Sequence, residues 1–378
     1  MVIIGAGIVG AATAWWASRA QDSGSPTRRI LLLEAEAAPG MHSTGRSAAL
    51  YAPGYGPPMV RALTWASRAF YRQPPEGFAA QPLLSPRGAL FVGSAARRAA
   101  LAELMQTLQA EGGRPRWLEA AELQALVPVL EPAEAAFGVL DEQSLDIDVD
   151  ALLQGFLRGA RAAGVQLCCA ARLAAVQRQA DGWTLTAADG RCWRARQIVN
   201  AAGAWADEIA ALAGVPRIGL QPRRRTAFVF EPPPGLAIKH WPAVIDIDEQ
   251  WYFKPEAGLL LGSPANADPV PPHDVMPEEL DVAIGIDHLQ RVSRLRIHRP
   301  RRTWAGLRSF VPDGEPVIGP QPGAPGFFWA AALGGYGIQT APAVGALAAA
   351  WLDAARTGQE PQVEGRSARA LWPRVALG

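Results

Sequence analysis

Three glycines near the start of the chain, Gly5, Gly7 and Gly10, have the spacing Gly-x-Gly-x-x-Gly, which suits the pyrophosphate of a dinucleotide. The first glycine permits a tight turn, the second lets the backbone approach the phosphates, and the third lets a helix pack on a strand. The N–H groups at the start of such a helix bind the phosphates. Glu34, which ends an apolar run, can accept hydrogen bonds from ribose hydroxyls.

The elements that would position these residues come in the required order. Residues 2–4 predict a short buried strand, residues 11–17 a helix, and residues 28–33 a second strand. The alternative, a buried helix start and an unrelated surface glutamate, does not account for this order. Further runs with strand character, which would complete a Rossmann-type sheet and a flanking β-meander, lie at 165–170, 173–177, 183–187, 192–195 and 197–200.

Composition limits the kind of protein. The chain of 378 residues is long enough for two domains, and its net charge of +1 gives no reason to expect nucleic acid or an anionic membrane as a partner. No apolar run is long enough for a transmembrane segment. Cys168, Cys169 and Cys192 are too few and too badly spaced for a disulfide framework or a zinc site, so we predict no metal. Because Met1 lies almost against the first strand, there is no room for a signal peptide, and we expect a reducing, cytoplasmic location.

The segment after Glu34 is rich in small and hydroxyl-bearing residues: Pro39-Gly40 is followed by Ser43-Thr44-Gly45-Arg46-Ser47. On these residues the sequence resembles the FAD-dependent amine and D-amino-acid oxidoreductases, in which this segment lies along the pyrophosphate and the flavin ring. The resemblance implies FAD rather than NAD as the cofactor. Without it, a surface loop with a helix cap at Ser43 or Thr44 would be the expectation.

A second segment, Gly334 to Thr340, matches the flavin loop of the same family. Its glycines would let the backbone approach the ring, and the helix that follows would face N1 and O2, where reduction places negative charge. We predict this helix over 340–355, with Pro342 in its first turn. The FAD contacts implied by the resemblance are Gly5, Gly7, Val9, Gly10, Glu34, Ala35, Ser43, Thr44, Arg46, Ser47, Ala48, Ala49, Leu50, Val176, Gly203, Gly334, Gly335, Tyr336, Gly337, Ile338, Gln339 and Thr340.

From residue 216 onward, strand-like runs alternate with proline-rich loops, which indicates a second, mostly antiparallel sheet. The runs lie at 226–230, 243–247, 251–254 and 259–262. We therefore predict an α/β fold of the D-amino acid oxidase type, with a Rossmann-type FAD-binding domain and an inserted β-sheet substrate domain. The predicted FAD-binding domain comprises 1–85, 140–215 and 305–378, and the substrate domain comprises 86–139 and 216–304.

Two arginines are candidates for binding a substrate carboxylate, because a planar guanidinium matches a carboxylate bidentately. Arg308, in Trp304-Ala305-Gly306-Leu307-Arg308-Ser309-Phe310, resembles the family arginine with this role. Arg225 resembles a second such residue, although a run of three arginines is usually a solvated face. Tyr252 matches a family tyrosine that donates to the same carboxylate; a tyrosine on a sheet face is the alternative.

The loop over residues 51–58 is dense in glycine and proline and carries two tyrosines. We predict that Tyr55 closes over the substrate and excludes water, with ordinary packing as the alternative. The predicted catalytic residues are Tyr55, Arg225, Tyr252, Arg308 and Gln339. The predicted substrate contacts are Leu50, Tyr55, Ala89, Arg225, Tyr252, Arg308, Gly335 and Gln339.

Within the family the sequence most resembles the D-arginine dehydrogenase branch, with two departures. Members that prefer arginine carry a histidine where this chain has Leu50, and a glutamate where it has Ala89. Because a buried cation without a partner is costly, we expect a neutral, apolar D-amino acid instead. Ala89→Glu should then raise kcat/KM for D-Arg or D-Lys.

The resemblance implies oxidative deamination of the D-amino acid to a 2-oxo acid and ammonia, by hydride transfer from the α-carbon to flavin N5. An electron acceptor of unidentified chemistry would reoxidise the flavin. Three alternatives remain: a secondary-amine oxidase of the sarcosine or glycine oxidase type, a flavin-binding protein without turnover, and an NAD dehydrogenase, which the two flavin-type segments disfavour.

Overall fold

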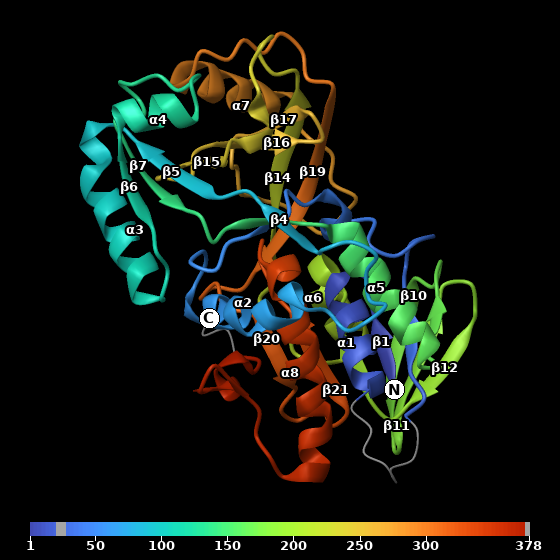
Figure 1. Ribbon diagram of the computed structural model, residues 1–378. Helices are drawn as coiled ribbons and strands as arrows, with labels where there is room; N and C mark the ends of the chain where they lie inside the picture. Colours follow the sequence, from blue (N-terminus) through green and yellow to red (C-terminus); the bar gives the residue numbers. More distant parts are fainter. Residues whose placement is uncertain (20–27, 375–378) are drawn as a thin grey trace.

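The computed structural model describes residues 1–19 and 28–374, which form two lobes (Figure 1). One lobe contains a six-stranded sheet around the dinucleotide motif. Its strands, in spatial order, are β20 (Val317–Pro320), β21 (Phe327–Ala331), β13 (Ile198–Asn200), β1 (Val2–Ile4), β2 (Leu31–Leu33) and β9 (Gln166–Cys168). All neighbours are parallel except β20, which is antiparallel to β21. Such strands are short apolar runs because both faces of a parallel sheet are covered.

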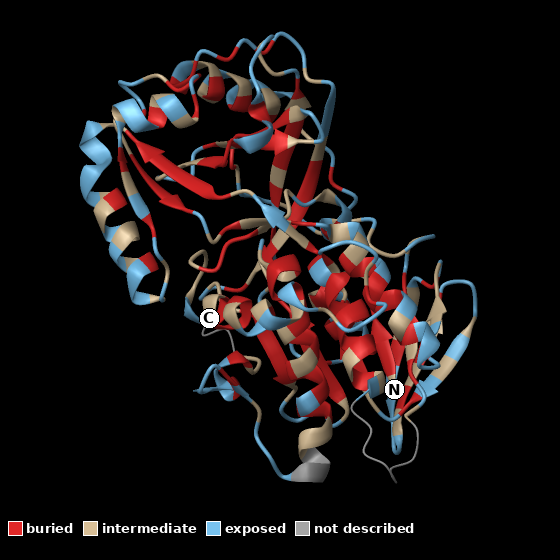
Figure 2. Cartoon of the chain, viewed as in Figure 1, coloured by how far each residue is buried: buried red, intermediate tan, exposed pale blue. Residues whose placement is uncertain are grey.

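Helices cover one face of this sheet. Helix α1 (Ile8–Arg19) packs between α8 (Gly337–Thr357) and α5 (Val149–Ala162). Gly345 lets α8 approach α1 closely, since a Cβ there would lie 2.7 Å from the carbonyl carbon of Ala12. Asp148 caps α5 by accepting a hydrogen bond from the Ala151 N–H (2.8 Å). Figure 2 shows this packed layer as largely buried.

The other face carries the predicted meander, β10 (Leu173–Gln179), β11 (Gly182–Ala187) and β12 (Cys192–Ala195). It packs with α6 (Ala206–Leu212) on a second apolar core, whereas η3 (Gly203–Trp205) packs in a smaller apolar cluster with β19. A further helix, α2 (Pro58–Arg72), lies against α8.

The second lobe is built on a nine-stranded, mostly antiparallel sheet. Its strands, in spatial order, are β18 (Asp268–Pro269), β14 (Gln221–Phe230), β17 (Leu259–Ser263), β16 (Tyr252–Glu256), β15 (Ala243–Asp246), β5 (Ala89–Gly93), β7 (Phe137–Asp141) and β6 (Arg116–Glu119), with β19 (Arg302–Phe310) paired to β14. Only β15 and β5 are parallel neighbours among these pairs of described strands. The helices of this lobe are α3 (Arg98–Ala110), α4 (Ala120–Leu126) and α7 (Glu279–Val292).

Short elements complete the described chain. A three-stranded sheet, β3 (Leu50–Tyr51), β8 (Leu145–Ile147) and β4 (Leu84–Pro86), lies where the lobes meet (Figure 1). The others are η1 (Ser43–Arg46), η2 (Ala95–Arg97), η4 (Ile238–His240), η5 (Ala368–Leu371), β22 (Gln362–Val363) and β23 (Arg366–Ser367). Across the described residues, no helix combines the length and the apolar character that crossing a bilayer requires.

Several element predictions need correction. Strand β14 begins at Gln221, five residues before the predicted start, because β19 pairs with it along its length. Strands β6 and β8 and helix α7 were not predicted. Their residues lack a clear alternation or a long apolar face, and packing against other elements stabilises them.

Helix α8 begins at Gly337, so Pro342 lies inside the helix and not in its first turn. A proline there leaves the carbonyl of Ile338 without its helical N–H donor. The buried Tyr71 of α2 donates its hydroxyl to that carbonyl. A neighbouring helix therefore replaces the missing hydrogen bond, which explains why the proline does not end α8.

The predicted division of the chain at 304/305 falls within β19, which stays paired with β14 from Arg302 to Phe310. By strand pairing, the chain returns to the first sheet only after residue 310. The domain boundaries remain a prediction.

Candidate active site

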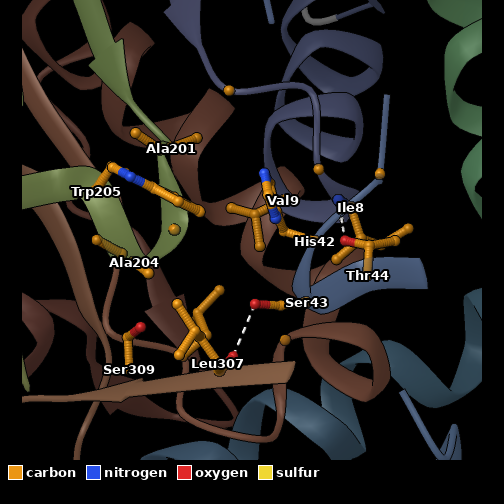
Figure 3. Close-up of a pocket in the computed structure, with 18 of the residues that line it drawn as sticks. Ile8, Val9, His42, Ser43, Thr44, Ala201, Ala204, Trp205, Leu307 and Ser309 are labelled. Carbon is orange, nitrogen blue, oxygen red and sulfur yellow. Dashed lines mark hydrogen bonds between the residues drawn. The ribbon is translucent and has the colours of Figure 1, made fainter. Parts of the chain in front are cut away.

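One cavity runs from the dinucleotide motif at the end of β1 to the strands β14 and β19 of the second lobe. Figure 3 shows side chains from the start of α1, from η1, from Ala201 just after β13, from η3 and from β19 around it. Of the residues predicted above, those that line it are Gly5, Gly7, Val9, Glu34, Ala35, Ser43, Thr44, Arg46, Ser47, Ala48, Gly203, Arg225, Tyr252, Arg308, Gly334, Gly335, Gly337 and Ile338.

The first end of the cavity is shaped by backbone. Gly5 has φ +99°, and a Cβ there would lie 2.4 Å from the carbonyl oxygen of Ala201, so the turn requires glycine. A Cβ on Gly10 would lie 1.9 Å from the Gly5 carbonyl oxygen, which explains the third glycine of the motif. The start of α1 leaves first-turn N–H groups for an anion.

Glu34 is buried and held by backbone. Its Oε2 accepts from the Ala6 N–H (2.8 Å) and its Oε1 from the Glu36 N–H (3.0 Å). Each carboxylate oxygen has a further lone pair, so the side chain can still accept from ribose hydroxyls at the cavity wall.

The segment η1 joins both lobes to the cavity. Thr44 Oγ1 accepts from the Ile8 N–H (3.1 Å), and Ser43 Oγ donates to the Leu307 carbonyl of β19 (2.7 Å) (Figure 3). Arg46 donates to the carbonyls of Val275 (2.8 Å) and Ala305 (3.1 Å), and it pairs with Asp274. Its guanidinium therefore binds the second lobe.

The second end of the cavity carries two arginine side chains. Arg225 on β14 lies opposite Gly306 of β19, and Arg223 lies opposite Arg308. Arg225 and Arg308 are therefore diagonal neighbours on one face of the sheet. We call these two residues the arginine pair. Among the described residues neither has an ion pair with a carboxylate, and Tyr252, which also lines this end, makes no hydrogen bond through its hydroxyl.

The two arginines are held differently. Arg225 donates from Nε to the Asn266 carbonyl (2.7 Å). The Arg308 guanidinium packs on backbone, since a Cβ on Gly335 would lie 2.9 Å from its Cζ. The Gly334 N–H donates to the Ser309 carbonyl (2.9 Å) and so joins the predicted flavin loop to β19. Burial, and then the neighbouring charge of Arg308, lower the pKa of Arg225 to about 10.

Tyr55 lies outside the lining of the cavity. Its hydroxyl donates to Glu249 Oε2 (3.1 Å), and its ring centroid is 5.3 Å from that of Tyr336. Burial is the main cause that raises the pKa of its phenol. The predicted residues that the structure does not bring to the cavity lining are Gly10, Ala49, Leu50, Tyr55, Ala89, Val176, Tyr336, Gln339 and Thr340.

The two predicted specificity positions pack at an apolar cluster outside the cavity lining. Ala89 is fully buried in an apolar cluster with Phe91, Leu108 and Val139, and Leu50 packs against the same cluster. Both residues therefore lie outside the cavity lining, because strand β5 directs the Ala89 side chain into this core, and their contact with substrate stays a prediction.

Two other predicted contacts are placed differently from expectation. Val176 is buried in the core beneath the meander, and Arg172 and Leu173 line the cavity instead. Gln339 is buried; its Oε1 accepts from the Ala52 N–H (3.0 Å), while its Nε2 has no partner among the described residues. It connects the flavin loop to residues 51–57.

The sequence interpretation missed several residues at the cavity. His42 and Trp205 line it with ring centroids 4.6 Å apart (Figure 3), and His42 Nε2 lies 3.2 Å from Glu36 Oε1. Trp205 follows the run of small residues after β13, which was a usable signal. Asn266 does not line the cavity but binds Arg225, and the sequence offered no signal for it, because it lies in a proline-rich loop.

Comparison with known proteins now identifies the family. Residues 1–351 match the DAO family, described as FAD dependent oxidoreductase, so the chain belongs to it. A curated relative, FAD-dependent oxidoreductase domain-containing protein 1 of Bos taurus, is 25% identical over 91% of this chain and 79% of its own length.

Solved structures share the fold over nearly the whole chain. Glycine oxidase from Geobacillus kaustophilus has a TM-score of 0.83 at 20% identity, covering 100% of this chain and 98% of its own. L-proline dehydrogenase from P. horikoshii has a TM-score of 0.82 at 20% identity, covering 98% and 96%. The predicted fold class is confirmed.

The cofactor is FAD, as predicted, and the NAD alternative is set aside. The cavity fits this molecule. Its first end has the glycine turn, the helix start and Glu34 for an adenosine diphosphate, and its second end has the bare backbone of Gly334 and Gly335 beside the arginine pair. The roles of individual side chains toward FAD remain predictions.

Proposed function

We propose that the protein oxidises the carbon–nitrogen bond of a small amino acid with a primary or secondary amine, such as glycine, sarcosine or proline. The observation that carries this proposal is the arginine pair, two guanidiniums on the cavity wall without a carboxylate partner among the described residues. Both guanidiniums are largely desolvated and neither forms an ion pair, so a substrate carboxylate would give them a charge-assisted, bidentate partner.

The chemistry follows from this placement. Bound FAD would supply the acceptor for a hydride that leaves the substrate α-carbon. The arginine pair and Tyr252 would hold the carboxylate, so that the α-carbon faces the backbone of Gly334 and Gly335. The amine must reach this position neutral, so its proton is lost to water. The resulting imine then takes up water. Glycine would yield a 2-oxo acid and ammonia, and sarcosine the same acid and methylamine. The cyclic imine of proline would open to a 2-oxo acid that keeps the primary amine.

The names of the two solved structures support a small substrate, since one is a glycine oxidase and the other an L-proline dehydrogenase. The secondary-amine alternative therefore takes precedence over the D-amino-acid interpretation. The latter also loses its specificity argument, because Leu50 and Ala89 do not line the cavity. Oxidation of a neutral D-amino acid stays the second candidate on the strength of the resemblance to D-arginine dehydrogenases.

The test is anaerobic reduction of the purified holoprotein, followed as loss of visible flavin absorbance after addition of one amino acid at a time. We expect sarcosine, proline or glycine to bleach the flavin faster than D-Met, D-Leu or D-Phe. The reverse order would make the D-amino-acid interpretation correct. If no amino acid bleaches the flavin but photoreduction does, the protein binds FAD without this activity and the proposal is wrong.

A further inference from the structure

We propose that Asn266 and Asp281 are positioning residues that fix Arg225 for carboxylate binding, although neither lines the cavity. The proposal rests on the proposed function, because it assumes that Arg225 binds the substrate carboxylate. It concerns residues on a loop and on α7, behind the strand that carries Arg225.

One edge of β14 has a gap in its strand pairing. On one edge, β14 pairs with β18 at Arg223 and Arg224, and with β17 only from Phe228 onward. Between these pairings the Asn266 side chain takes the place of a strand, because its Oδ1 accepts from the Thr226 N–H (2.8 Å). The same residue presents its main-chain carbonyl to Nε of Arg225 (2.7 Å).

This contact selects one orientation of the Arg225 side chain. With Nε bound to the Asn266 carbonyl, the two terminal nitrogens are the donors that remain for a ligand in the cavity. An arginine held in this way loses less conformational entropy when it binds a carboxylate. Asn266 therefore prepares Arg225 for its ligand.

Asn266 is in turn held by Asp281, a buried carboxylate of α7. One oxygen of Asp281, Oδ2, accepts from Asn266 Nδ2 (3.0 Å), Thr226 Oγ1 (2.8 Å) and Arg224 Nε (2.9 Å). The Asp281 side chain is only 9% exposed, so these bonds are shielded from water. Asp281 thus connects α7, the loop and β14 at the residues that flank Arg225.

The three consecutive arginines are consequently separated by role. Arg223 is exposed and lies over the Phe310 ring. Arg224 points to the opposite face from Arg225 and is paired with Asp281 and Glu278. The acids on α7 therefore balance Arg224 and leave the charge of Arg225 for the cavity.

The experiment uses holoenzyme and measures the Kd of acetate, a carboxylate without an amine, from its perturbation of the flavin spectrum. Asn266→Ala removes three side-chain hydrogen bonds, to the Thr226 N–H, to Asp281 and to Asp268 (2.7 Å), and it loosens the carbonyl that binds Arg225. We expect the Kd of acetate and the KM of the substrate to rise about tenfold, with kcat changed less than about twofold. A purely structural role would instead lower FAD content and the thermal midpoint and leave the Kd unchanged.

The matched control is Glu278→Gln. Glu278 also pairs with Arg224, but its side chain is 59% exposed and it does not bind Asn266. It should leave the Kd of acetate unchanged; an equal rise in both variants would overturn the proposal. Asp281→Asn should resemble Asn266→Ala. If it does not yield folded holoenzyme, Asn266→Ala alone decides.

A double-mutant cycle separates this inference from the proposed function. If Asn266 acts through Arg225, Asn266→Ala should add almost no further change to Kd in an Arg225→Gln background. Additive effects would refute the positioning role while leaving carboxylate binding by Arg225 intact. If Arg225→Gln itself leaves the Kd of acetate unchanged, the proposed function fails first.

Discussion

The two ends of the cavity are built in different ways. The dinucleotide end uses backbone shape, a helix start and one carboxylate, all within the first 34 residues of the chain. The other end uses the side chains of Arg225 and Arg308, which come from distant parts of the sequence and meet because β14 and β19 pair. The first site is therefore built from residues close together in the sequence, and a side chain added at Gly5 or Gly10 would clash with backbone. The second depends on the register of two strands and on charge.

The largest effect is expected at the dinucleotide end. Gly5→Val places a side chain against the Ala201 carbonyl at a backbone φ of +99°, and we expect the purified protein to retain less than about one-tenth of its FAD. Flavin absorbance per protein measures this. Gly235→Ala is the control, since Gly235 has φ +79° but open space around it. Normal FAD content in Gly5→Val would contradict a site defined by backbone.

Arg308→Ala should separate the two ends. We expect kcat/KM to fall about 100-fold or more, because truncating one partner of a buried charged pair costs about 2–5 kcal/mol. FAD content should stay unchanged. Arg223→Ala is the control. It removes the exposed arginine that lies opposite Arg308 across the strand pair, and it should have little effect on kcat/KM. Unchanged turnover in Arg308→Ala would favour a flavin-binding protein without its own activity.

Much of this contrast could be predicted from the sequence. The glycine motif, the second strand and Glu34 are contiguous, so local order was sufficient to place the first end and to identify the fold class. The arginines at 225 and 308 could be named by resemblance. Their diagonal placement could not be predicted, because a shift of one residue between β14 and β19 would move Arg308 to the opposite face.

Other features were outside the reach of sequence patterns. Asn266 acts through a main-chain carbonyl, and any residue type has one. Pro342 suggested a helix start, whereas the hydroxyl of Tyr71 makes it acceptable inside α8. Both cases depend on a partner distant in sequence, which no local pattern reports.

Ala89→Glu tests whether position 89 belongs to the substrate site or to the apolar core. The sequence predicted a gain toward D-Arg, but the structure places Ala89 fully buried among apolar side chains. We now expect a loss of about 3 kcal/mol in the free energy of unfolding, because a carboxylate would be buried without a partner. Denaturant unfolding of the holoenzyme measures it, with Ala89→Val as a control for size. A stable variant with improved kcat/KM for D-Arg would restore Ala89 as a specificity position.

The smallest effect concerns pH. Arg225 has a pKa lowered to about 10, and carboxylate binding needs its charged form. The affinity for acetate should therefore be full below that pKa and fall by up to about tenfold per pH unit above it. Titrations between about pH 8 and about pH 10.5 measure this. Arg225→Gln should bind acetate weakly with a flat profile, and an identical profile in both proteins would assign the titration to another group.

The pairing of β14 with β19 has a consequence for how the protein fluctuates. Nine consecutive register pairs, from Gln221 opposite Phe310 to Val229 opposite Arg302, form the longest hydrogen-bonded ladder among the described strands. Backbone amides in such a ladder exchange with solvent deuterium only when large parts of a protein open. We therefore expect the amides around the arginine pair to exchange slowly. Substrate entry and product exit would then depend on movements of the surrounding loops, while the charges themselves stay in place.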